Sequence, residues 1–493
     1  MSDKSNPATR RTTSLSVLVP VYNEQYLVAT SLERLRVLAE SPLLDRVQVI
    51  VVDDRSTDQT PEVLRQFAEK VSNERGKISW DFHRHQENLG KGGAVRTAID
   101  CADCELSVIH DADLEYHPRD LLRMIPLFLD EGADAVFGSR FMAGEFKRAL
   151  FLRHQFGNKL LTFLCDLACD LDLTDMETCY KMVRTDLLRT IPLFSRDYRI
   201  EPEITIKLAK RGARIYEVPI SYTGRTYQEG KKIRWTDGVK ALVAIARYRI
   251  SDRVFKPDTF GSEVAERLRH APRYTNWIAD KVRPFMGDDV LELGANVGSM
   301  TLSLIPRTRY CAADANPLFV RELEKLRDTR PYLSAMRLDP SQPLTSLNGA
   351  SFDTVICQNV LEHVDDDEDV LRRCAAVLRP GGRILVLAPQ SPALRGSLDD
   401  YLGHRRRYGA ADLERLAGKA GLRVAHVGGV NRAGSAAWWI NARLLRRRQI
   451  SLFQMKVLNL ATPLLRAIEP LLPLPSLTLF AVLQKPGSGE VTS

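Results

Sequence analysis

The sequence predicts an α/β protein of two domains, and three features of its 493 residues lead to this prediction. In the first half, apolar runs rich in β-branched residues alternate with helical patterns, which is typical of a parallel sheet. A polar stretch with Pro257 and Gly261 then interrupts the pattern. In the second half, a strand, a glycine turn and a helix start follow one another at residues 289–298. We therefore predict a flexible tail (1–13), a first domain (14–250), a linker (251–272), a second domain (273–486) and a closing tail (487–493).

The composition limits the classes of partner. The net charge of +8 favours anionic partners, which include nucleotides, acidic lipid headgroups and nucleic acid. Nucleic acid is not expected, because no recognition module accompanies the charge. Eight cysteines without a framework spacing indicate free thiols and a reducing compartment. Cys101 and Cys104 lack the second pair of ligands that a structural zinc site needs.

Neither secretion nor a membrane span is expected from the sequence. Residues 1–13 are polar and lack the apolar core of a signal peptide. The charge-free segment 470–484 contains three prolines and is too short to cross a bilayer. We therefore expect a cytoplasmic protein, and any membrane contact is expected to be peripheral, on the inner face.

Three predicted strands of the first domain end in acidic residues. They are residues 14–21 before Glu24, residues 47–52 before Asp53 and Asp54, and residues 106–109 before Asp111 and Asp113. A helix is expected after the first strand, at about residues 25–39. Because the carboxyl ends of parallel strands meet at one edge, these carboxylates are expected to converge. Residues i and i+2 of an extended chain point the same way, so Asp111 and Asp113 can face one Mg²⁺ or Mn²⁺ ion. A solvated turn is the alternative interpretation of this pair.

The segment NLGKGGA at residues 88–94 predicts a glycine-rich loop that opens a helix at about Val95. Glycines let a backbone approach a phosphate, and the helix start and Lys91 supply positive potential. Most such loops are only turns, and the spacing does not match the nucleoside-triphosphatase loop. His110, beside the acid pair, is expected to be a packed residue rather than a base.

The ordered motifs VPVYNE, VVDDRSTDQT, NLGKGGA, DADLEYHP, FGSRF, METCYK and EGKKIRW resemble the family 2 glycosyltransferases, specifically the dolichyl or polyprenyl phosphate sugar synthase branch. The resemblance covers about residues 14–249. It implies a GT-A fold, a nucleotide-sugar donor and a divalent metal. The implied nucleoside residues are Pro20, Tyr22, Glu24 and Asp53, and the implied ribose and metal residues are Asp111 and Asp113. Lys91 is added to the nucleotide-sugar residues because of its charge in the glycine-rich loop. Glu115 stands where many relatives have Gln, and a third carboxylate can strengthen the metal site or repel the donor diphosphate.

Basic residues of the same motifs are candidates for binding phosphates. They are Arg140, Arg225, Lys231 and Lys232. Residues 224–232 are expected to form a mobile lid, with a plain solvated surface as the alternative. Asp175 and Glu177 either orient the acceptor or cap a helix. A lipid phosphate acceptor is already anionic and needs no strong general base.

Residues 150–173 carry apolar side chains at helical spacing, and core burial is the default interpretation. An isoprenoid chain would also need such a surface, and Arg148, Arg153 and Lys159 would suit a headgroup region.

In the second domain, the predicted strand 289–293 runs into a turn in which Asn296 replaces the middle glycine of the dinucleotide pattern. Asn is the residue other than glycine that most readily adopts a positive φ, so the turn can survive. A second short strand, 310–313, ends at Asp314, which is well placed to accept hydrogen bonds from ribose hydroxyls.

The motifs VLELGANVG, AADAN, RLDPSQP, FDTVICQNVLEHVDD and LRPGGRILVLAP resemble a class I S-adenosylmethionine-dependent methyltransferase with a Rossmann-like fold; a Rossmann dehydrogenase is the competing interpretation. The cofactor residues that the resemblance implies are Glu292, Gly294, Gly298, Asp314, Asp339, Asn359 and Glu362. His363 either acts as base for a sugar hydroxyl or packs under the cofactor. His404 and Arg407 either bind an acceptor or belong to a basic surface loop. Arg443 to Arg448, near Trp438 and Trp439, are either solvated or membrane-facing.

Taken together, these features predict a bifunctional transferase. The first domain is expected to move a sugar from a nucleotide sugar to a polyprenyl phosphate, and the second to methylate a related glycan or lipid intermediate. A soluble glycan, protein or metabolite acceptor is the alternative, and so is a domain that only binds its ligand.

Overall fold

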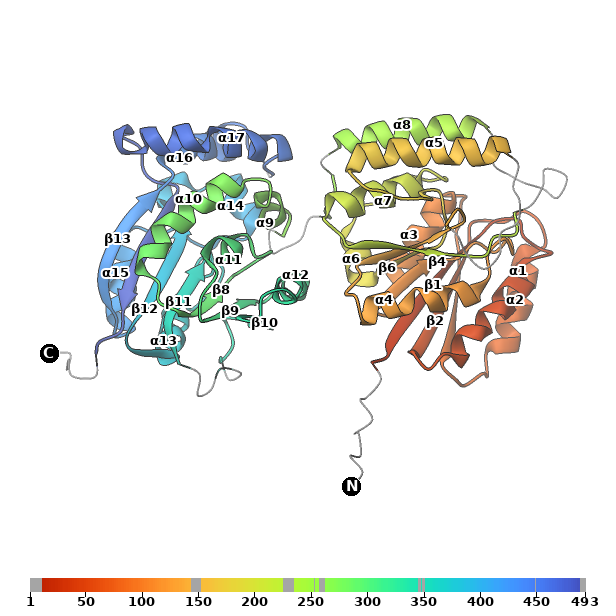
Figure 1. Cartoon of the computed structure of the whole chain (residues 1–493), viewed down its shortest axis with the longest axis horizontal. Coiled ribbons are helices and arrows are strands. Elements are labelled where there is room, and N and C mark those ends of the chain that lie inside the picture. Colours follow the sequence, from red (N-terminus) through yellow and green to blue (C-terminus); the bar gives the residue numbers. More distant parts are fainter. Residues whose placement is uncertain are drawn as a thin grey trace, which may run out of the picture. The chain divides into compact units, whose positions relative to one another are not determined.

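The computed structural model describes residues 11–142, 152–224, 235–251, 253–256, 262–344, 347, 351–447 and 449–487. The chain divides into two compact units, Met1–Lys256 and Pro257–Ser493 (Figure 1). Part of the stretch 251–272 that we expected to be a linker forms a helix, α9 (Ser262–Leu268). Glu263 of this helix accepts a hydrogen bond from the hydroxyl of Tyr401, inside the second unit.

The first unit is built on a seven-stranded sheet in the order β3-β2-β1-β4-β6-β5-β7. Its strands are β1 (Thr13–Val21), β2 (Leu44–Asp53), β3 (Ile78–Arg84), β4 (Leu106–Ile109), β5 (Ala135–Ser139), β6 (Lys181–Arg184) and β7 (Ile215–Pro219). Only β6 runs antiparallel to its neighbours. The central strands are buried on both faces, which explains their nearly continuous apolar sequence.

The helices of the first unit connect these strands. They are α1 (Val28–Arg34), α2 (Thr60–Val71), α3 (Lys91–Cys101), α4 (Ile125–Leu129), α5 (Leu152–Cys169), α6 (Thr185–Thr190), α7 (Ile200–Lys210) and α8 (Trp235–Ile250), with short 3₁₀ turns at Leu35–Glu40 and Pro118–Arg123. The helix expected at residues 25–39 is thus α1 followed by a 3₁₀ turn. Helices α5 and α8 lie side by side and pack together (Figure 1).

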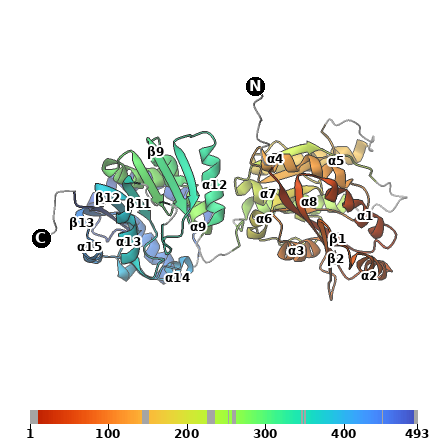
Figure 2. The ribbon, with the colours of Figure 1, turned by 90° about the horizontal axis from the view of Figure 1, so that it is seen from below.

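The second unit has a seven-stranded sheet in the order β10-β9-β8-β11-β12-β14-β13. Strands β9, β11, β12 and β13 of this sheet are labelled in Figure 2. Its strands are β8 (Asp289–Leu293), β9 (Arg309–Asp314), β10 (Leu333–Arg337), β11 (Phe352–Gln358), β12 (Leu378–Pro389), β13 (Arg423–Val430) and β14 (Thr478–Gln484). Only β14 runs antiparallel to its neighbours. The predicted α/β class with two domains is confirmed.

The helices of the second unit flank this sheet. Besides α9 they are α10 (Pro272–Val282), α11 (Ser299–Leu304), α12 (Pro317–Arg327), α13 (Asp367–Ala376), α14 (Ser397–Leu402), α15 (Ala410–Lys419), α16 (Arg432–Trp439) and α17 (Leu452–Ile468). All eight cysteines are free, as expected. Among the described residues, no helix has the length and apolar character that crossing a membrane requires.

Candidate functional sites

The predicted acidic residues of the first unit follow adjacent parallel strands. Strand β1 pairs with β2 on one side and with β4 on the other, so the carboxyl ends of all three strands lie at one edge of the sheet. The turn after β1 is tied to the loop after β2, because the amide of Glu24 donates to Thr60 Oγ1 (2.9 Å). Asp53 is almost fully buried, and its Oδ2 lies 3.1 Å from Arg84 Nε. Tyr22 is 42% exposed beside this edge, where a base can stack on it.

Asp111 belongs to a network of charged side chains. Lys91 Nζ donates to Asp111 Oδ2 (2.9 Å) and to Glu201 Oε1 (3.1 Å). Lys181 Nζ donates to the other oxygen of Glu201 at 2.8 Å. Burial alone would lower the pKa of Lys91, but the carboxylates of Asp111 and Glu201 raise it well above its usual value. Lys91 is therefore a fixed cation beside the predicted metal ligand. Glu201 and Lys181 were not predicted as site residues.

Several backbone amides of the glycine-rich loop bond to other parts of the first unit. The amides of Leu89 and Gly90 donate to the carboxylate of Asp54, at 2.8 and 2.7 Å. The amide of Gly92 donates to the carbonyl of Arg196 (2.9 Å). A Cβ on Gly92 would lie 2.0 Å from the carbonyl oxygen of Ser195. These glycines therefore admit the protein's own backbone, and the nucleotide-sugar role of Lys91 stays a prediction.

Asp113 and Glu115 lie on a turn with an unusual backbone, since Leu114 has a φ of +64°. Asp113 Oδ1 accepts the amide hydrogen of Glu115 (3.1 Å). Glu115 Oε2 accepts a hydrogen bond from the hydroxyl of Tyr222 (2.8 Å). One oxygen of Glu115 is thus already engaged, while its role as a metal ligand stays a prediction.

Arg140 is held in a buried ion pair. Its Nε and Nη2 donate to the two oxygens of Asp175, each at 2.7 Å, and its guanidinium lies 5.1 Å from the ring centroid of Tyr222. Asp175 therefore occupies the Nε and Nη2 atoms of Arg140. Whether Asp175 also orients an acceptor stays a prediction. Arg225, Lys231 and Lys232 lie outside the described residues, as do residues 225–232 of the lid expected at 224–232.

Two further side chains of this unit have perturbed pKa values. His110 bonds Ser31 Oγ (3.1 Å) and the hydroxyl of Tyr180 (3.0 Å), and burial lowers its pKa to about 4. The expectation that His110 is a packed residue is confirmed. Burial raises the pKa of Glu177 to about 7, and one oxygen of its carboxylate has no hydrogen-bond partner among the described residues.

Helix α5 exposes a stripe of apolar side chains, and the default expectation of core burial is wrong for them. Phe156, Phe163 and Leu167 are 69%, 63% and 68% exposed, and Leu160 is also exposed. The apolar residues of α8 that are exposed are Val239, Leu242, Val243 and Ile250. Helical periodicity predicted the stripe but not which surface would cover it. Arg148 and the side chain of Arg153 lie outside the described residues.

In the second unit, three residues of the turn after β8 have positive φ angles. They are Gly294 (+74°), Asn296 (+51°) and Gly298 (+78°), which confirms that Asn296 maintains the turn. A Cβ on Gly294 would lie 2.4 Å from the carbonyl oxygen of Gln358. Asp314 Oδ2 accepts the amide hydrogen of Asn296 (2.9 Å), so the carboxylate at the end of β9 also fixes the turn.

Glu292 supports this turn from the interior of the unit. The side chain is fully buried, and its Oε2 accepts hydrogen bonds from Thr301 Oγ1 (2.5 Å) and the hydroxyl of Tyr310 (2.9 Å). Burial raises the pKa of Glu292 to about 7, although both hydrogen bonds oppose the shift. Asp339, in contrast, is exposed on a turn and accepts hydrogen bonds from the amide and hydroxyl of Ser341. Their cofactor contacts stay predictions.

A cavity of about 590 Å³ opens beside this turn. It is lined by Asn296 from the turn, by Asn359 and His363 after β11, and by His404 and Arg407 after α14. Predicted cofactor residues and predicted acceptor residues thus share one cavity. Arg407 is not part of a surface loop: it is almost fully buried, and its Nε donates to Asp399 Oδ1 (2.7 Å).

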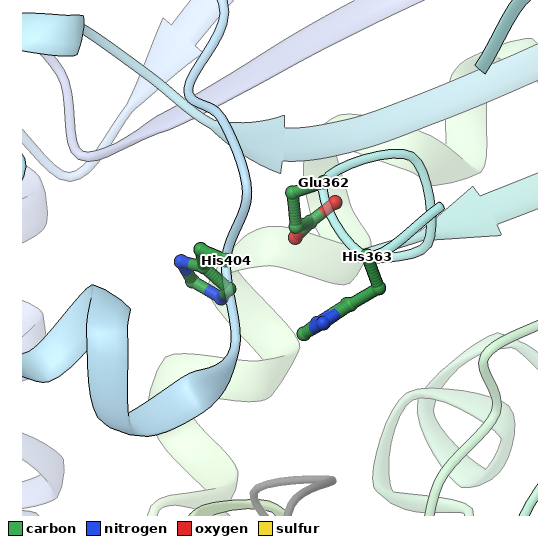
Figure 3. A group of neighbouring side chains, drawn as sticks. All are labelled: Glu362, His363 and His404. Atoms are coloured by element: carbon green, nitrogen blue, oxygen red, sulfur yellow. The ribbon is translucent and has the colours of Figure 1, made fainter. Parts of the chain in front are cut away.

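Glu362, His363 and His404 gather beside this cavity (Figure 3). One potential ligand atom of each residue lies within 4.8 Å of the other two. Burial raises the pKa of Glu362 to about 8. Burial, followed by the neighbouring His404, lowers the pKa of His363 to about 4. Glu362 and His363 are adjacent in the sequence, but the sequence did not indicate that His404 lies close to them.

Comparisons with known proteins agree with the two units. Residues 16–191 match the family model of glycosyl transferase family 2, and residues 291–384 match the model of a methyltransferase domain. An uncharacterized protein of Methanocaldococcus jannaschii is 28% identical over 239 residues, which cover 48% of this chain and 91% of that protein.

Two solved structures are similar to the separate halves. Glucosyl-3-phosphoglycerate synthase from Mycobacterium tuberculosis, in complex with UDP, aligns with a TM-score of 0.36 and 18% identity, covering 48% of this chain and 80% of that one. A protein of Haloferax volcanii in complex with the Trm112 methyltransferase activator aligns with a TM-score of 0.32 and 18% identity, covering 45% and 92%. From the two family matches, the chain is a fusion enzyme that joins a domain of glycosyl transferase family 2 to a methyltransferase domain.

Proposed function

We propose that the first unit transfers a sugar from a nucleotide sugar to a polyprenyl phosphate, and that the second unit methylates the resulting glycan or lipid intermediate. The observation that carries the lipid acceptor is the exposed apolar face of α5 and α8. Helix α5 packs on α7, and Glu201 of α7 bonds Lys91, which bonds Asp111. The apolar face is thus connected through one helix to the charged site.

The donor side of the proposal rests on the acidic edge of the sheet. Asp111 and Asp113 offer the hard oxygen ligands that suit Mg²⁺ or Mn²⁺, which would offset the negative charge that develops on the departing diphosphate. Lys91, whose pKa is raised well above its usual value, donates a hydrogen bond to Asp111 and places a positive charge beside the proposed metal ligand. Tyr22, Glu24 and Asp53 are proposed to hold the nucleoside, since they lie on the neighbouring strand ends. An acceptor phosphate oxygen can attack the sugar without a general base.

The methyl-transfer side rests on the shared cavity. S-adenosylmethionine would supply an already activated methyl group there. Gly294, Asn296 and Gly298 shape the turn, and Asp314 is proposed to accept hydrogen bonds from the ribose. His363 and His404 face the same cavity and are proposed to position the acceptor. Positioning supplies much of the rate of such a transfer.

The sugar-transfer test offers purified protein a panel of nucleotide sugars with Mn²⁺, with and without polyprenyl phosphate, and measures label in the organic extract. We expect lipid-dependent product with one donor. Asp113→Asn should abolish it, whereas Asp130→Asn, at an exposed position, should leave it unchanged. Turnover of the nucleotide sugar without lipid would contradict the proposal of a lipid acceptor and would indicate a soluble acceptor instead.

The membrane contact can be tested separately. Each unit has an apolar helical face, since α17 exposes Phe453, Leu460 and Leu464 at helical spacing. We propose peripheral binding through such faces. Phe163→Ser with Leu167→Ser should reduce co-sedimentation with anionic vesicles, while Tyr26→Ser, at an exposed residue outside α5 and α8, should not. Equal sedimentation of the wild type, the double variant and Tyr26→Ser would contradict the proposed role of α5 in membrane binding.

A further inference from the structure

The cluster of Glu362, His363 and His404 combines three side chains that commonly bind metal ions. Glu362 and His363 lie on the turn after β11, and His404 follows α14 (Figure 3). Their potential ligand atoms lie within 4.8 Å of one another, so a small movement of the side chains would let one ion contact all three. The amide of Arg405 donates to the carbonyl of Glu362 (2.8 Å), so the two segments are held together without a ligand.

The carboxylate of Glu362 accepts no hydrogen bond from another residue in the part of the chain that the structure describes, although the charge of Arg407 acts on it. The side chain of Glu362 is 0% exposed. Buried polar groups are almost always paired, because an unpaired one costs desolvation energy without compensation. A cation placed between Glu362 and the two imidazoles would supply the missing partner.

His404 is oriented in the way that metal-binding histidines usually are. Its Nδ1 lies 2.9 Å from Asp399 Oδ1, so this nitrogen donates its hydrogen to the carboxylate and Nε2 is the nitrogen left to bind an ion. Asp399 is itself fixed, because it accepts hydrogen bonds from Arg407 Nε (2.7 Å) and from the indole of Trp438 (3.3 Å). The second carboxylate therefore selects the tautomer that can bind a metal.

We propose that Glu362, His363 and His404 bind a divalent transition-metal ion. Imidazole nitrogens favour ions such as Zn²⁺, Fe²⁺, Co²⁺ or Mn²⁺ over Mg²⁺ and Ca²⁺. Three protein ligands leave coordination positions open. His363 and His404 also line the cavity that includes Asn296, so these positions face the proposed methyl acceptor. This site is distinct from the carboxylate pair of the first unit.

This site defines the class of acceptor, a deduction that rests on the proposed methyl transfer. An acceptor hydroxyl bound to the ion loses its proton more readily, and this proton passes to solvent. The oxygen then forms the new bond to the methyl carbon, while the carbon–sulfur bond breaks and leaves its electron pair on sulfur. The acceptor is therefore a hydroxyl-bearing molecule such as a sugar, and His363 is a ligand instead of a general base.

Binding of Co²⁺ to the full-length protein tests the site. The parent protein carries Asp111→Asn and Asp113→Asn, so that the first unit does not contribute, and is freed of metal with a chelator. We expect one equivalent of Co²⁺ with visible absorption. His363→Ala and His404→Ala should each weaken binding at least tenfold, and Asp399→Asn by about 10- to 100-fold. The control Glu414→Gln, at an exposed position, should bind as the parent does.

Absence of stoichiometric Co²⁺ binding by the parent would overturn the inference, as would unchanged binding by the two histidine variants. If those variants do not fold, pulsed EPR of Mn²⁺ bound to the parent decides: coupling to imidazole nitrogen supports the site, and its absence overturns it. Calorimetric titration with S-adenosylmethionine separates the two claims. A parent that binds this cofactor but no metal refutes the metal site alone, whereas one that binds metal but no cofactor refutes only the methyl transfer.

Discussion

Replacement of Glu292 by Gln tests how the turn of the methyltransferase unit is supported. The carboxyl group is fully buried, and its pKa is raised from 4.5 to about 7, chiefly by burial. An acid whose folded pKa is raised holds its proton more tightly in the folded state. The contribution of Glu292 to stability is therefore fully present below pH 4.5 and is lost as the pH rises through about 7. The difference between the two pKa values corresponds to about 3 kcal/mol.

The assay compares urea unfolding of the wild type and Glu292→Gln between pH 4.5 and pH 8, followed by tryptophan fluorescence. A glutamine keeps an oxygen for Thr301 and Tyr310 but does not titrate. The stability of the variant relative to the wild type should therefore rise by about 3 kcal/mol across this range. Glu414→Gln, at an exposed glutamate, should show no such trend. A difference between wild type and Glu292→Gln that is independent of pH would refute the reasoning.

Three further predictions concern the turns and the charged sites. Gly92→Ala should lower the free energy of unfolding by about 1–3 kcal/mol, because the new Cβ would meet a backbone oxygen at 2.0 Å. The control Gly76→Ala, at a position with open space around it, should not lower it. Equal unfolding midpoints of the two variants would contradict this prediction. Asp314→Ala should weaken S-adenosylmethionine binding by about 1.5–3 kcal/mol in calorimetry, and unchanged affinity would remove Asp314 from the ribose role. Asp175→Ala should leave the buried cation of Arg140 unpaired and lower the stability by about 3–5 kcal/mol in denaturant unfolding; a near-neutral effect would show that Arg140 has another anionic partner.

Local sequence patterns predicted the strands and the acidic residues after them. The apolar runs before Asp53 and Asp111 are buried strands, and β1 lies between them, so the three strand ends meet as expected. The turn around Asn296 was also predictable, because positive φ angles restrict the residues that can occupy it. These features depend on interactions between near neighbours or on the general rules of parallel sheets.

Contacts between distant segments were not predictable in the same way. Lys91 bonds Glu201, 110 positions away, and nothing in either local pattern indicates this pair. The glycines at 90 and 92 are typical of a phosphate-binding loop. In the structure they are needed because a Cβ at either position would collide with the backbone of residues 195–196. The helical periodicity of the sequence predicted the apolar stripe of α5. Whether such a stripe is buried or exposed depends on which other helices pack on it, and here the stripe is exposed.

The central claim is that both units act in turn on one lipid-linked acceptor. The most direct measurement supplies the protein with a sugar-labelled nucleotide donor, methyl-labelled S-adenosylmethionine, Mn²⁺ and polyprenyl phosphate, and analyses the organic extract by mass spectrometry. We predict one product that carries both labels, loss of both labels in Asp113→Asn, and loss of the methyl label alone in Asp314→Ala. A sugar-labelled lipid that never acquires the methyl label would contradict the claim.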